Sequence, residues 1–506
     1  MRRLEAAVFL SGAALMGLEI AGSRVLAPVF GTSVFVWGAL ITTFLASLSV
    51  GYAVGGRLAD RWPDARLLAA LLAAAGVFVW VPCFRPEPLL LAFSRFPTED
   101  RFQALLAAVA LFAVPSILMG AVTPFAVRLR MRDVASAGRA AGRLSAISTA
   151  GSILGAFSMA FVLIPVLPLG PIVFGLGASL VLSALLAHPT PRLPHAAAAT
   201  GLLAAAGSAF LLVPAPVATP VPGGKVVFQK ETAYHRLQVV EQGPRRALFF
   251  DNRLQGWVPI DPATRLARNY VDGLLAAASL RPFPPRRTLA IGLGAGMIPS
   301  FLSRNVPGCE NVSVEIDPEV VRVARDYFGF TPGARNRVVV GDGRRELSRM
   351  EGTFDVIFVD AFFADSLPFH LVTKEFYELC SSKLAPDGVL ALNFVGLLAG
   401  DGDALFWSAY RTLQQVFPRQ YVLCGELAEG KKTFVGNALL LATKTAVRIS
   451  REEFVERTAD LARRVARPEI GEWGELLYDG EVMGAGLPIL TDAYAPTDAL
   501  QHLVRR

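Results

Sequence analysis

Long, nearly continuous apolar runs dominate the first part of the chain, whereas apolar and polar positions alternate over short stretches in the remainder. Seven runs approach the roughly 20 apolar residues that a helix needs to cross a bilayer. They cover residues 4–28, 34–58, 66–84, 102–127, 143–165, 168–187 and 196–217. This pattern predicts a multi-span α-helical membrane domain over residues 1–222.

Arginines flank these runs in a pattern that predicts their orientation. Arg57 and Arg61 follow the second run, and a basic cluster over residues 128–143 follows the fourth. Because basic loops stay in the cytoplasm, the N-terminus is predicted to be cytoplasmic. Seven complete spans would place the second half outside, whereas an interfacial last segment, interrupted by Pro214 and Pro216, would return it to the cytoplasm. We expect a cytoplasmic second half, with the number of spans left open.

Composition supports a membrane protein and argues against other classes. Of the 506 residues, 53% are hydrophobic and 18% are charged, and the net charge is +7. This excess is arginine beside apolar runs in the first half, while the second half is balanced, so nucleic acid is not an expected partner. The four cysteines lie far apart without metal-ligand spacing, so no metal site is predicted.

Alternation after the Pro-rich stretch that ends at Pro222 predicts a soluble unit. Residues 234–241 and 247–252 alternate around a Gln-Gly-Pro turn, which predicts an antiparallel hairpin, and residues 265–280 follow a helical pattern. We therefore expect a β-hairpin segment with a leading helix over residues 223–285. A larger α/β unit is expected over residues 286–506.

Four short apolar runs in this larger unit each end in residues suited to ligand binding. The run at 288–291 leads into a Gly-x-Gly-x-Gly turn, and the runs at 312–314, 337–340 and 354–359 lead to acidic residues. The residues concerned are Gly292, Gly294, Gly296, Glu315, Asp342 and Asp360. In a Rossmann-like sheet of parallel strands, all of them would meet at the carboxyl edge, where such sheets bind ligands.

The spacing of these residues is typical of a nucleoside site. Glycines let the backbone approach a ligand, and an acidic residue about 20 positions later accepts hydrogen bonds from two ribose hydroxyls. The alternative is that each acid caps the helix or turn that follows it. Capping explains any single acid more readily than all of them together.

On these motifs the second half resembles the spermidine synthase (polyamine aminopropyltransferase) family, in its membrane-fused bacterial form. The first half is similar to the opening helices of major-facilitator-like fusions. The shared motifs include Leu248-Phe249-Phe250-Asp251, Ile291-Gly292-Leu293-Gly294, Val314-Glu315-Ile316-Asp317, Gly341-Asp342-Gly343 and Val359-Asp360-Ala361 in the second half, and Leu18-Glu19-Ile20 in the first.

The resemblance implies a Rossmann-like, methyltransferase-type fold that transfers an aminopropyl group from decarboxylated S-adenosylmethionine to a polyamine amine. Asp360 would act on the attacking amine. The nucleoside would be held by Gly292, Gly294, Gly296, Glu315, Asp342 and Gly343, and the acceptor side would include Gln255, Tyr234, His235, Tyr270 and Asp365. It further implies a multi-pass protein of the bacterial inner membrane, in contact with lipid, and allows a homodimer.

Departures from the family pattern keep two other functions open. The family commonly has an Asp in the glycine loop where this chain has Ala295, and that acid helps to seat the amine of the decarboxylated donor. A methyltransferase that uses intact S-adenosylmethionine on a lipid or membrane-delivered substrate is therefore an alternative. A transporter or sensor that binds a polyamine or nucleoside without turnover is another, supported by Glu19 and Arg24 within the first apolar run.

Overall fold

The chain forms two compact units, which are described separately. One comprises residues 1–218 with 230–236, and the other comprises residues 219–229 with 237–506. The computed structural model describes residues 2–31, 33–84, 86–98, 100–131, 134–190, 193–212, 220–232, 234–261, 269–361, 368–398, 404–424, 434–478, 486–497 and 500.

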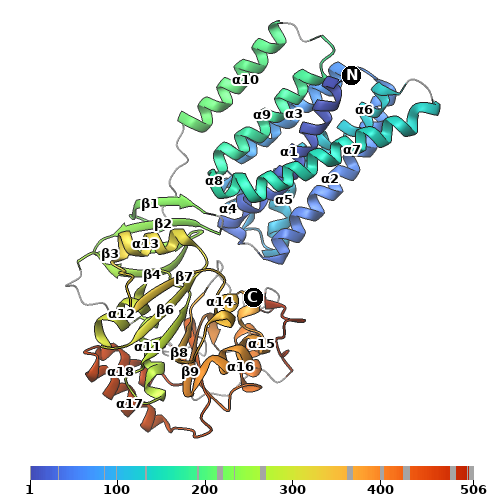
Figure 1. Ribbon diagram of the computed structural model, residues 1–506. Coiled ribbons are helices and arrows are strands. Elements are labelled where there is room, and N and C mark those ends of the chain that lie inside the picture. The colour runs from blue at the N-terminus through green and yellow to red at the C-terminus, as the bar shows by residue number, and fades with distance from the viewer. Residues whose placement is uncertain are drawn as a thin grey trace. The chain divides into compact units, whose positions relative to one another are not determined.

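The first unit is built from helices (Figure 1). Each predicted apolar run contains a helix, and short helices lie between some of them. Their bounds are α1 (Arg2–Phe30), α2 (Val34–Arg61), α3 (Ala65–Phe84), α4 (Glu87–Phe93), α5 (Asp100–Gly120), α6 (Val122–Arg130), α7 (Val134–Ser158), a π-helical turn η1 (Met159–Leu163), α8 (Ile164–Val166), α9 (Leu169–Ala187) and α10 (Leu193–Leu212).

Five helical stretches among the described residues are long and apolar enough to cross a membrane, judged by length and composition. They are Arg2–Phe30, Val34–Arg61, Arg101–Arg130, Ala137–Val166 and Leu169–Ala187. The stretches Ala65–Val81 and Ala197–Gly207, which correspond to two of the seven predicted runs, are apolar but shorter.

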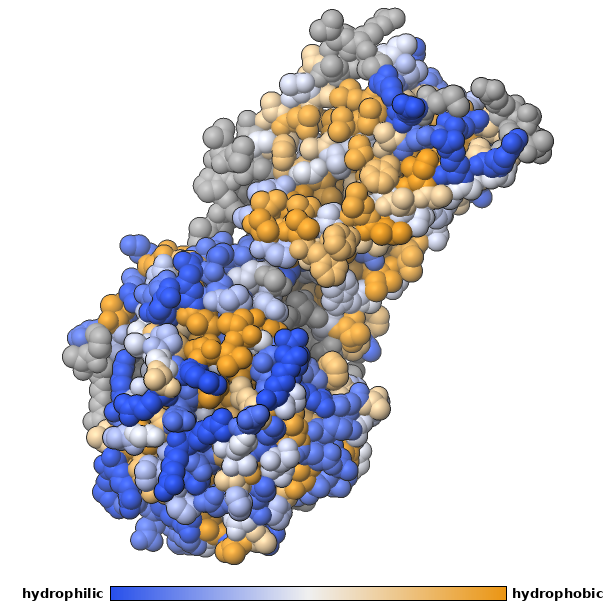
Figure 2. All heavy atoms as spheres, in the orientation of Figure 1, coloured by the Kyte–Doolittle hydropathy of each residue, from blue (hydrophilic) through white to orange (hydrophobic). Residues whose placement is uncertain are grey.

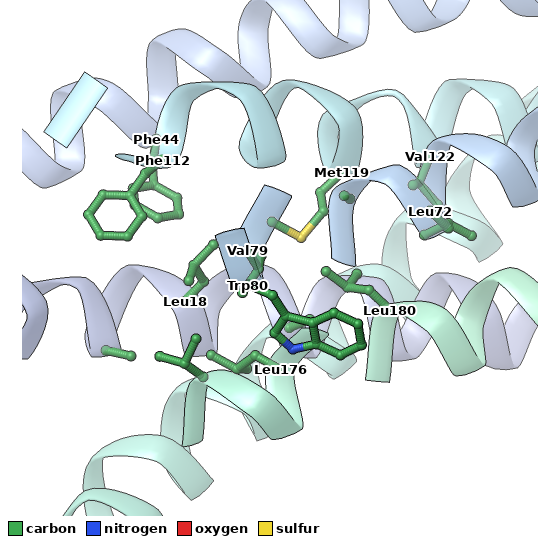
Figure 3. Close-up of a cluster of buried hydrophobic side chains, with 14 of the residues drawn as sticks. Leu18, Phe44, Leu72, Val79, Trp80, Phe112, Met119, Val122, Leu176 and Leu180 are labelled. Atoms are coloured by element: carbon green, nitrogen blue, oxygen red, sulfur yellow. The ribbon is translucent and has the colours of Figure 1, made fainter. Parts of the chain in front are cut away.

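A contiguous apolar core holds the helical unit together (Figure 3). Phe44 and Phe112 lie with their ring centroids 5.7 Å apart, and they join α2 to α5. The Trp80 ring of α3 lies against α9 beside Leu176 and Leu180. Its indole N–H donates to the carbonyl oxygen of Phe174 at 3.0 Å, so this buried polar group is satisfied.

Apolar side chains also cover the outside of the helical unit. Figure 2 shows them over much of its visible face, whereas polar and charged side chains predominate on the visible face of the second unit. On α7 and the turn that follows it, Ile153 is 66% exposed and Phe161 is 72% exposed. An exterior of this kind is costly in water and is typical of a helix that faces lipid or another apolar surface.

The second unit contains two sheets (Figure 1). The smaller is a four-stranded antiparallel sheet in the order β1-β2-β3-β4, where the sequence predicted a single hairpin. Its strands are β1 (Lys225–Glu231), β2 (Arg236–Gln242), β3 (Arg245–Phe250) and β4 (Arg253–Pro259). The two outer strands were not predicted because their alternation is weak: β1 and β4 are mostly exposed or half-buried.

The larger sheet has seven strands in the order β10-β11-β9-β8-β5-β6-β7. Strands β7, β6, β5, β8 and β9 are parallel, and β11 runs antiparallel to its neighbours β9 and β10. The strands are β5 (Arg287–Ile291), β6 (Glu310–Glu315), β7 (Asn336–Val340), β8 (Phe354–Val359), β9 (Leu384–Leu398), β10 (Arg419–Cys424) and β11 (Phe434–Thr443). This mixed, doubly wound sheet is the methyltransferase type of Rossmann-like fold, as predicted.

Helices cover both faces of this sheet. One apolar layer lies beneath α14, α15 and α16, and the other lies beneath α11, α12, α17 and α18. The helices are α11 (Tyr270–Ala276), its 3-10 continuation η2 (Ala277–Leu280), α12 (Met297–Asn305), α13 (Pro318–Phe328), α14 (Gly343–Arg349), η3 (Phe369–Leu371), α15 (Lys374–Lys383), α16 (Ala404–Gln414), α17 (Arg451–Arg464) and α18 (Pro468–Glu475).

Predicted and observed elements agree closely in the parallel half of the larger sheet. The four apolar runs are β5, β6, β7 and β8, and the helix after the glycine turn is α12. The helix predicted over residues 265–280 begins at Tyr270, where Asn269 and Asp272 form a capping box, and residues 262–268 lie outside the described residues.

Close packing of α1 against α7 generates a testable prediction. A Cβ atom added at Gly151 would lie 2.1 Å from the carbonyl oxygen of Phe9, so only glycine allows the two backbones to approach. We expect Gly151→Ala to destabilise the helical unit by about 1–3 kcal/mol through overpacking. Thermal unfolding of the detergent-solubilised chain measures the loss.

Gly142 supplies the matched control because it lies on the same helix, and a Cβ atom added there would meet nothing within 4 Å. Gly142→Ala is expected to leave stability unchanged or to raise it slightly, since alanine favours helix. Equal stability of the two variants would contradict this account of the α1–α7 contact.

Candidate active site

Parallel pairing brings the ends of β5, β6, β7 and β8 to one edge of the sheet. Ile291 is in register with Val314 on one side and Val359 on the other, and Glu315 is in register with Val340. Backbone hydrogen bonds continue past the strands: the Gly292 N–H donates to the Val314 carbonyl, and the Asp360 N–H donates to the Ile291 carbonyl, both at 2.8 Å. The glycine turn, Glu315, Asp342 and Asp360 therefore lie at the predicted carboxyl edge.

The glycine turn after β5 needs glycine for two reasons at Gly292. Its φ is +94°, a region that other residues rarely adopt. A Cβ atom there would also lie 2.1 Å from the carbonyl oxygen of Asp360. The turn thus brings the backbone of Gly292 against the end of β8 and leads into α12, whose N-cap is Gly296.

Glu315 is buried and binds the backbone on both sides of the edge. Its Oε2 accepts a hydrogen bond from the Leu293 N–H at 3.0 Å, and its Oε1 accepts one from the Asp317 N–H at 3.1 Å. These bonds fix the carboxylate between the glycine turn and the start of α13. The same carboxylate therefore shapes the turn and stands at the place where the sequence predicted ribose binding.

Asp342 caps α14 and also contacts the segment before α15. One oxygen accepts a hydrogen bond from the Arg345 N–H, and the other lies 2.9 Å from Nε2 of His370. Burial alone would raise the pKa of Asp342, but Arg345 and His370 more than offset it and hold that pKa below its usual value. Asp342 is therefore an ionised acceptor, with both oxygens engaged in this structure.

Asp360 is partly buried and held by two side chains from distant elements. Tyr270, the first residue of α11, donates its hydroxyl to Oδ2 at 3.1 Å, and the Asn393 amide of β9 donates to Oδ1 at 2.8 Å. Burial raises the pKa of Asp360, whereas the hydrogen bonds from Asn393 and Tyr270 lower it; the net direction is upward. A carboxylate with a raised pKa at a ligand-binding edge is suited to accept a proton.

Tyr270 connects Asp360 to the small sheet. Its hydroxyl lies 3.2 Å from the backbone carbonyl oxygen of Gln255 on β4, as well as near Asp360. Burial, followed by the charge of Asp360 and the hydrogen bond to it, raises the pKa of Tyr270 well above its usual value, so the phenol keeps its proton. The Gln255 side chain itself donates to the Arg253 carbonyl oxygen at 3.3 Å.

The other residues predicted for the acceptor side have different positions. Tyr234 and His235 lie in the connection between β1 and β2, where both backbone N–H groups donate to the Thr232 hydroxyl at 3.1 and 3.0 Å. Asp365 lies outside the described residues. Gly343 begins α14, and a Cβ there would lie 2.3 Å from Cγ2 of Ile291, so its role in this structure is close packing of α14 on β5.

Two features of the site were not predicted. Asn393 was not identified, although it is a single polar residue that interrupts the apolar run of β9, between Leu392 and Phe394. The second feature is Arg344, whose guanidinium makes a bidentate ion pair with Asp492, both contacts at 2.6 Å. Asp492 lies 148 residues away, so the pair depends on how the C-terminal segment folds back.

No group of three or more His, Cys, Asp or Glu side chains suited to a metal ion occurs in the part of the chain that the structure describes. The free cysteines Cys309, Cys380 and Cys424 are buried. Burial raises the pKa of Cys309, which argues against a reactive thiolate there.

Known proteins resemble this unit in sequence. Residues 285–421 match the spermine/spermidine synthase domain. A polyamine aminopropyltransferase of Vibrio vulnificus is 29% identical over 288 residues, which are 54% of this chain and 91% of that protein. The human eEF1A lysine and N-terminal methyltransferase is 30% identical over 199 residues, or 37% of this chain and 27% of the human protein. The domain match and the aminopropyltransferase relatives support an enzyme of the transferase class.

Solved structures were also matched. A probable spermidine synthase from Corynebacterium glutamicum is 20% identical with a TM-score of 0.38, and it covers 47% of this chain and 88% of its own. The spermidine synthase from Thermotoga maritima is 19% identical with a TM-score of 0.37, covering 55% and 87%.

The glycine turn generates a prediction on stability. Gly292→Ala places a methyl group against the Asp360 backbone at a φ that alanine avoids, so we expect a loss of about 2–5 kcal/mol. Gly294 has φ +51° and no atom within 4 Å of an added Cβ, so Gly294→Ala is the matched comparison, with a loss of about 1 kcal/mol. Denaturant unfolding of the full chain measures both, and equal losses would contradict the proposed contact.

The Arg344–Asp492 pair generates a prediction on pH. The hydrogen bond from Arg344 holds the pKa of Asp492 below its usual value. Stability from such a carboxyl is present above its unfolded pKa of about 3.9 and is lost as pH falls through its folded pKa. The protection factors of the amides in residues 486–497, which correct for the intrinsic exchange rate at each pH, should therefore fall on acidification below about pH 4. In Asp492→Asn, these protection factors should already be lower at neutral pH and depend less on pH.

Asp326 provides the control for this experiment. Its pKa is also lowered by a neighbouring arginine, Arg325, but it lies on α13. Asp326→Asn should leave the exchange profile of residues 486–497 unchanged. The same acid dependence in Asp492→Asn as in the unchanged chain would refute the role of the ion pair.

Proposed function

We propose that the second unit is a spermidine synthase-like aminopropyltransferase that uses decarboxylated S-adenosylmethionine and a polyamine. The observation that carries this proposal is the meeting of the glycine turn, Glu315, Asp342 and the Tyr270–Asp360 pair at one sheet edge. The domain match over residues 285–421 supports the same reaction class.

The donor nucleoside fits the residues at the ends of β5, β6 and β7. The glycine turn exposes backbone to a planar or polar ligand, and Glu315 is an acceptor fixed beside it for ribose hydroxyls. Asp342 would accept a hydrogen bond from the adenine amino group. Because both of its oxygens are engaged here, we infer that the donor displaces or shares the His370 contact.

Asp360 would handle the proton of the acceptor amine. An alkylammonium has a pKa of about 10.4, so the attacking nitrogen must first lose a proton, which Asp360 accepts. The freed lone pair then forms a bond to the carbon beside the sulfonium, and the carbon–sulfur bond breaks with its electrons on sulfur. Methylthioadenosine leaves as a neutral thioether, and the positive charge passes from sulfur to the alkylated nitrogen. Alignment of nitrogen, carbon and sulfur supplies the remaining rate enhancement.

A methyltransferase that uses intact S-adenosylmethionine is a second candidate, favoured by Ala295. Its side chain is buried in an apolar cluster with Leu237 and Phe250 of the small sheet and Val320 of α13. A carboxylate that would hold the amine of a decarboxylated donor is therefore missing at this position of the loop. The similarity to the human methyltransferase is consistent with this candidate.

We further propose that the helical unit anchors the enzyme in a bacterial inner membrane. Its five long apolar helices and their exposed apolar side chains support contact with lipid. The basic residues near α2, α6 and α7 favour a cytoplasmic N-terminus and a cytoplasmic catalytic unit. Lipid contact and a homodimer remain proposals from the sequence.

Product analysis tests the proposed function. The purified full chain is incubated with S-adenosylmethionine or its decarboxylated form, together with candidate polyamines. Methylthioadenosine formed only from the decarboxylated donor supports aminopropyl transfer, whereas S-adenosylhomocysteine supports the methyltransferase. Neither product with any amine or lipid acceptor would contradict both.

Asp360→Asn tests the role of the carboxylate. We expect at least a 100-fold loss of kcat, the usual size of general-base effects, with nucleoside affinity retained. Because the base form of Asp360 must be present and its pKa is raised, turnover in the unchanged chain should fall on acidification at a pH above that of a free aspartate. Asp355→Asn, at the amino end of the same strand, is the control and should keep its turnover. Unchanged turnover in Asp360→Asn would defeat the assignment.

A further inference from the structure

Three neighbouring strands of the large sheet, β8, β9 and β11, carry a polar residue on the same face, at or near the edge where β8 ends. Residues 356 and 358 of β8, 389 and 391 of β9, and 439 and 441 of β11 all point into the apolar layer beneath α11. Because side chains alternate along a strand, Asp360, Asn393 and Asn437 continue these three columns on the same face. The antiparallel register of β11 with β9 places Asn437 diagonally beside Asn393.

These side chains form a directed chain of hydrogen bonds. The Asn437 amide nitrogen donates to Oδ1 of Asn393 at 3.0 Å, and the Asn393 amide nitrogen donates to Oδ1 of Asp360 at 2.8 Å. Asn393 is 2% exposed, so leaving either end of its amide unpaired would be costly. Since Asn437 occupies the oxygen of Asn393 with a donor, the nitrogen of Asn393 must face Asp360.

This direction constrains one oxygen of the Asp360 carboxylate. The Asn393 amide N–H points at Oδ1 and needs an acceptor there. Protonation of Oδ1 on the side that faces Asn393 is therefore disfavoured. The reverse arrangement, with the Asn393 oxygen facing Asp360, would need a proton on Oδ1 and a reversed Asn437. Asn437 therefore distinguishes two hydrogen-bond patterns that differ in the protonation of Asp360.

The other oxygen of Asp360 has an adaptable neighbour. The single hydroxyl proton of Tyr270 lies within reach of Oδ2 of Asp360 at 3.1 Å and of the Gln255 carbonyl at 3.2 Å. When Oδ2 is unprotonated, Tyr270 donates to it. When Oδ2 takes a proton, Tyr270 can donate to Gln255 and accept from Asp360 without losing a hydrogen bond.

We propose that Asn437 is a positioning residue that, through Asn393, keeps Oδ1 of Asp360 as an acceptor and directs the substrate proton to Oδ2 beside Tyr270. The inference rests on the proposed function in taking Asp360 as the base, and it adds which oxygen receives the proton and what enforces that choice. Among the described side chains hydrogen-bonded to the Asp360 carboxyl, Asn393 is neutral and Tyr270 is the titratable group.

Infrared titration of the full chain, without donor or acceptor, tests the proposal. The C=O stretching band of protonated Asp360 is assigned by its loss in Asp360→Asn, and its pH midpoint is then followed. Asn437→Ala removes the donor that fixes Asn393, so the midpoint should rise by about one to two pH units, the size expected for a hydrogen bond to a charged group. Asn437→Asp keeps the shape of the side chain but offers only acceptors, so it should raise the midpoint at least as far.

The matched control is Asn336→Ala. Asn336 of β7 is likewise hydrogen-bonded to a buried amide, here as the acceptor from Asn311 at 3.2 Å, but the pair lies at the amino ends of β6 and β7. This variant should lose stability without moving the Asp360 midpoint. An unmoved midpoint in both Asn437 variants would overturn the proposal.

Kinetics provide a second, separable measurement. If the chain transfers aminopropyl groups, Asn437→Ala should lower kcat and shift the acidic limb of the kcat profile upward by the same interval, with the KM for the donor unchanged. An upward shift of the infrared midpoint in a chain without transfer activity would sustain the inference on Asp360 and refute the proposed function alone. If Asn437→Ala changed kcat and the KM for the donor together, without shifting the pH profile of kcat, the role of Asn437 would be structural and the proposal would be overturned.

Discussion

The partial burial of the Asp360 carboxylate is the constraint around which the carboxyl edge of the large sheet is organised. A buried charge is unfavourable unless hydrogen-bond donors surround it. Here the donors come from α11 and β9, while the glycine turn packs against the Asp360 backbone. Satisfying one carboxylate thus requires two segments, distant in sequence, to reach the end of β8, where the glycine turn also packs.

Glu315 and Asp342 have structural roles that are compatible with the ligand-binding roles proposed for them. Glu315 accepts backbone hydrogen bonds that hold the glycine turn against β6, and Asp342 caps α14. The alternative explanation from the sequence, that an acidic residue caps the following helix, is therefore correct for Asp342. It does not exclude a ligand, since a carboxylate has about four acceptor positions and a cap uses only one of them.

The two units differ in where their apolar side chains lie. In the helical unit, apolar side chains lie both inside and outside, and every backbone group must be paired within a helix if lipid surrounds it. In the α/β unit, apolar layers are confined to the two faces of the sheet, and its polar residues gather at the exterior and at the strand ends. The helical unit therefore depends on close approach of helix backbones, whereas the α/β unit depends on hydrogen-bonded partners for its buried polar side chains.

Elements whose causes are local could be predicted from the amino-acid pattern alone. Long apolar runs predicted the helices of the first unit, short apolar runs ending in Gly or an acidic residue predicted β5 to β8, and the glycine spacing predicted the turn at Gly292. Tyr270 became a candidate only through the family resemblance, which did not indicate that its hydroxyl lies beside Asp360. The reason is that the spacing of apolar residues within a short stretch indicates the type of element and the face that it buries, so residues close in sequence are enough to predict it.

The partners of the polar side chains, by contrast, depend on how the chain folds back on itself. Asn393 and Asn437 meet because β11 inserts antiparallel beside β9 in one register, and a shift by one residue would turn Asn437 to the other face. Arg344 meets Asp492, and Tyr270 meets Asp360, across 148 and 90 residues of chain. Strand order and register determine which of the many polar residues of the same type become partners. Neither can be predicted from the hydrophobic pattern of a short stretch of sequence.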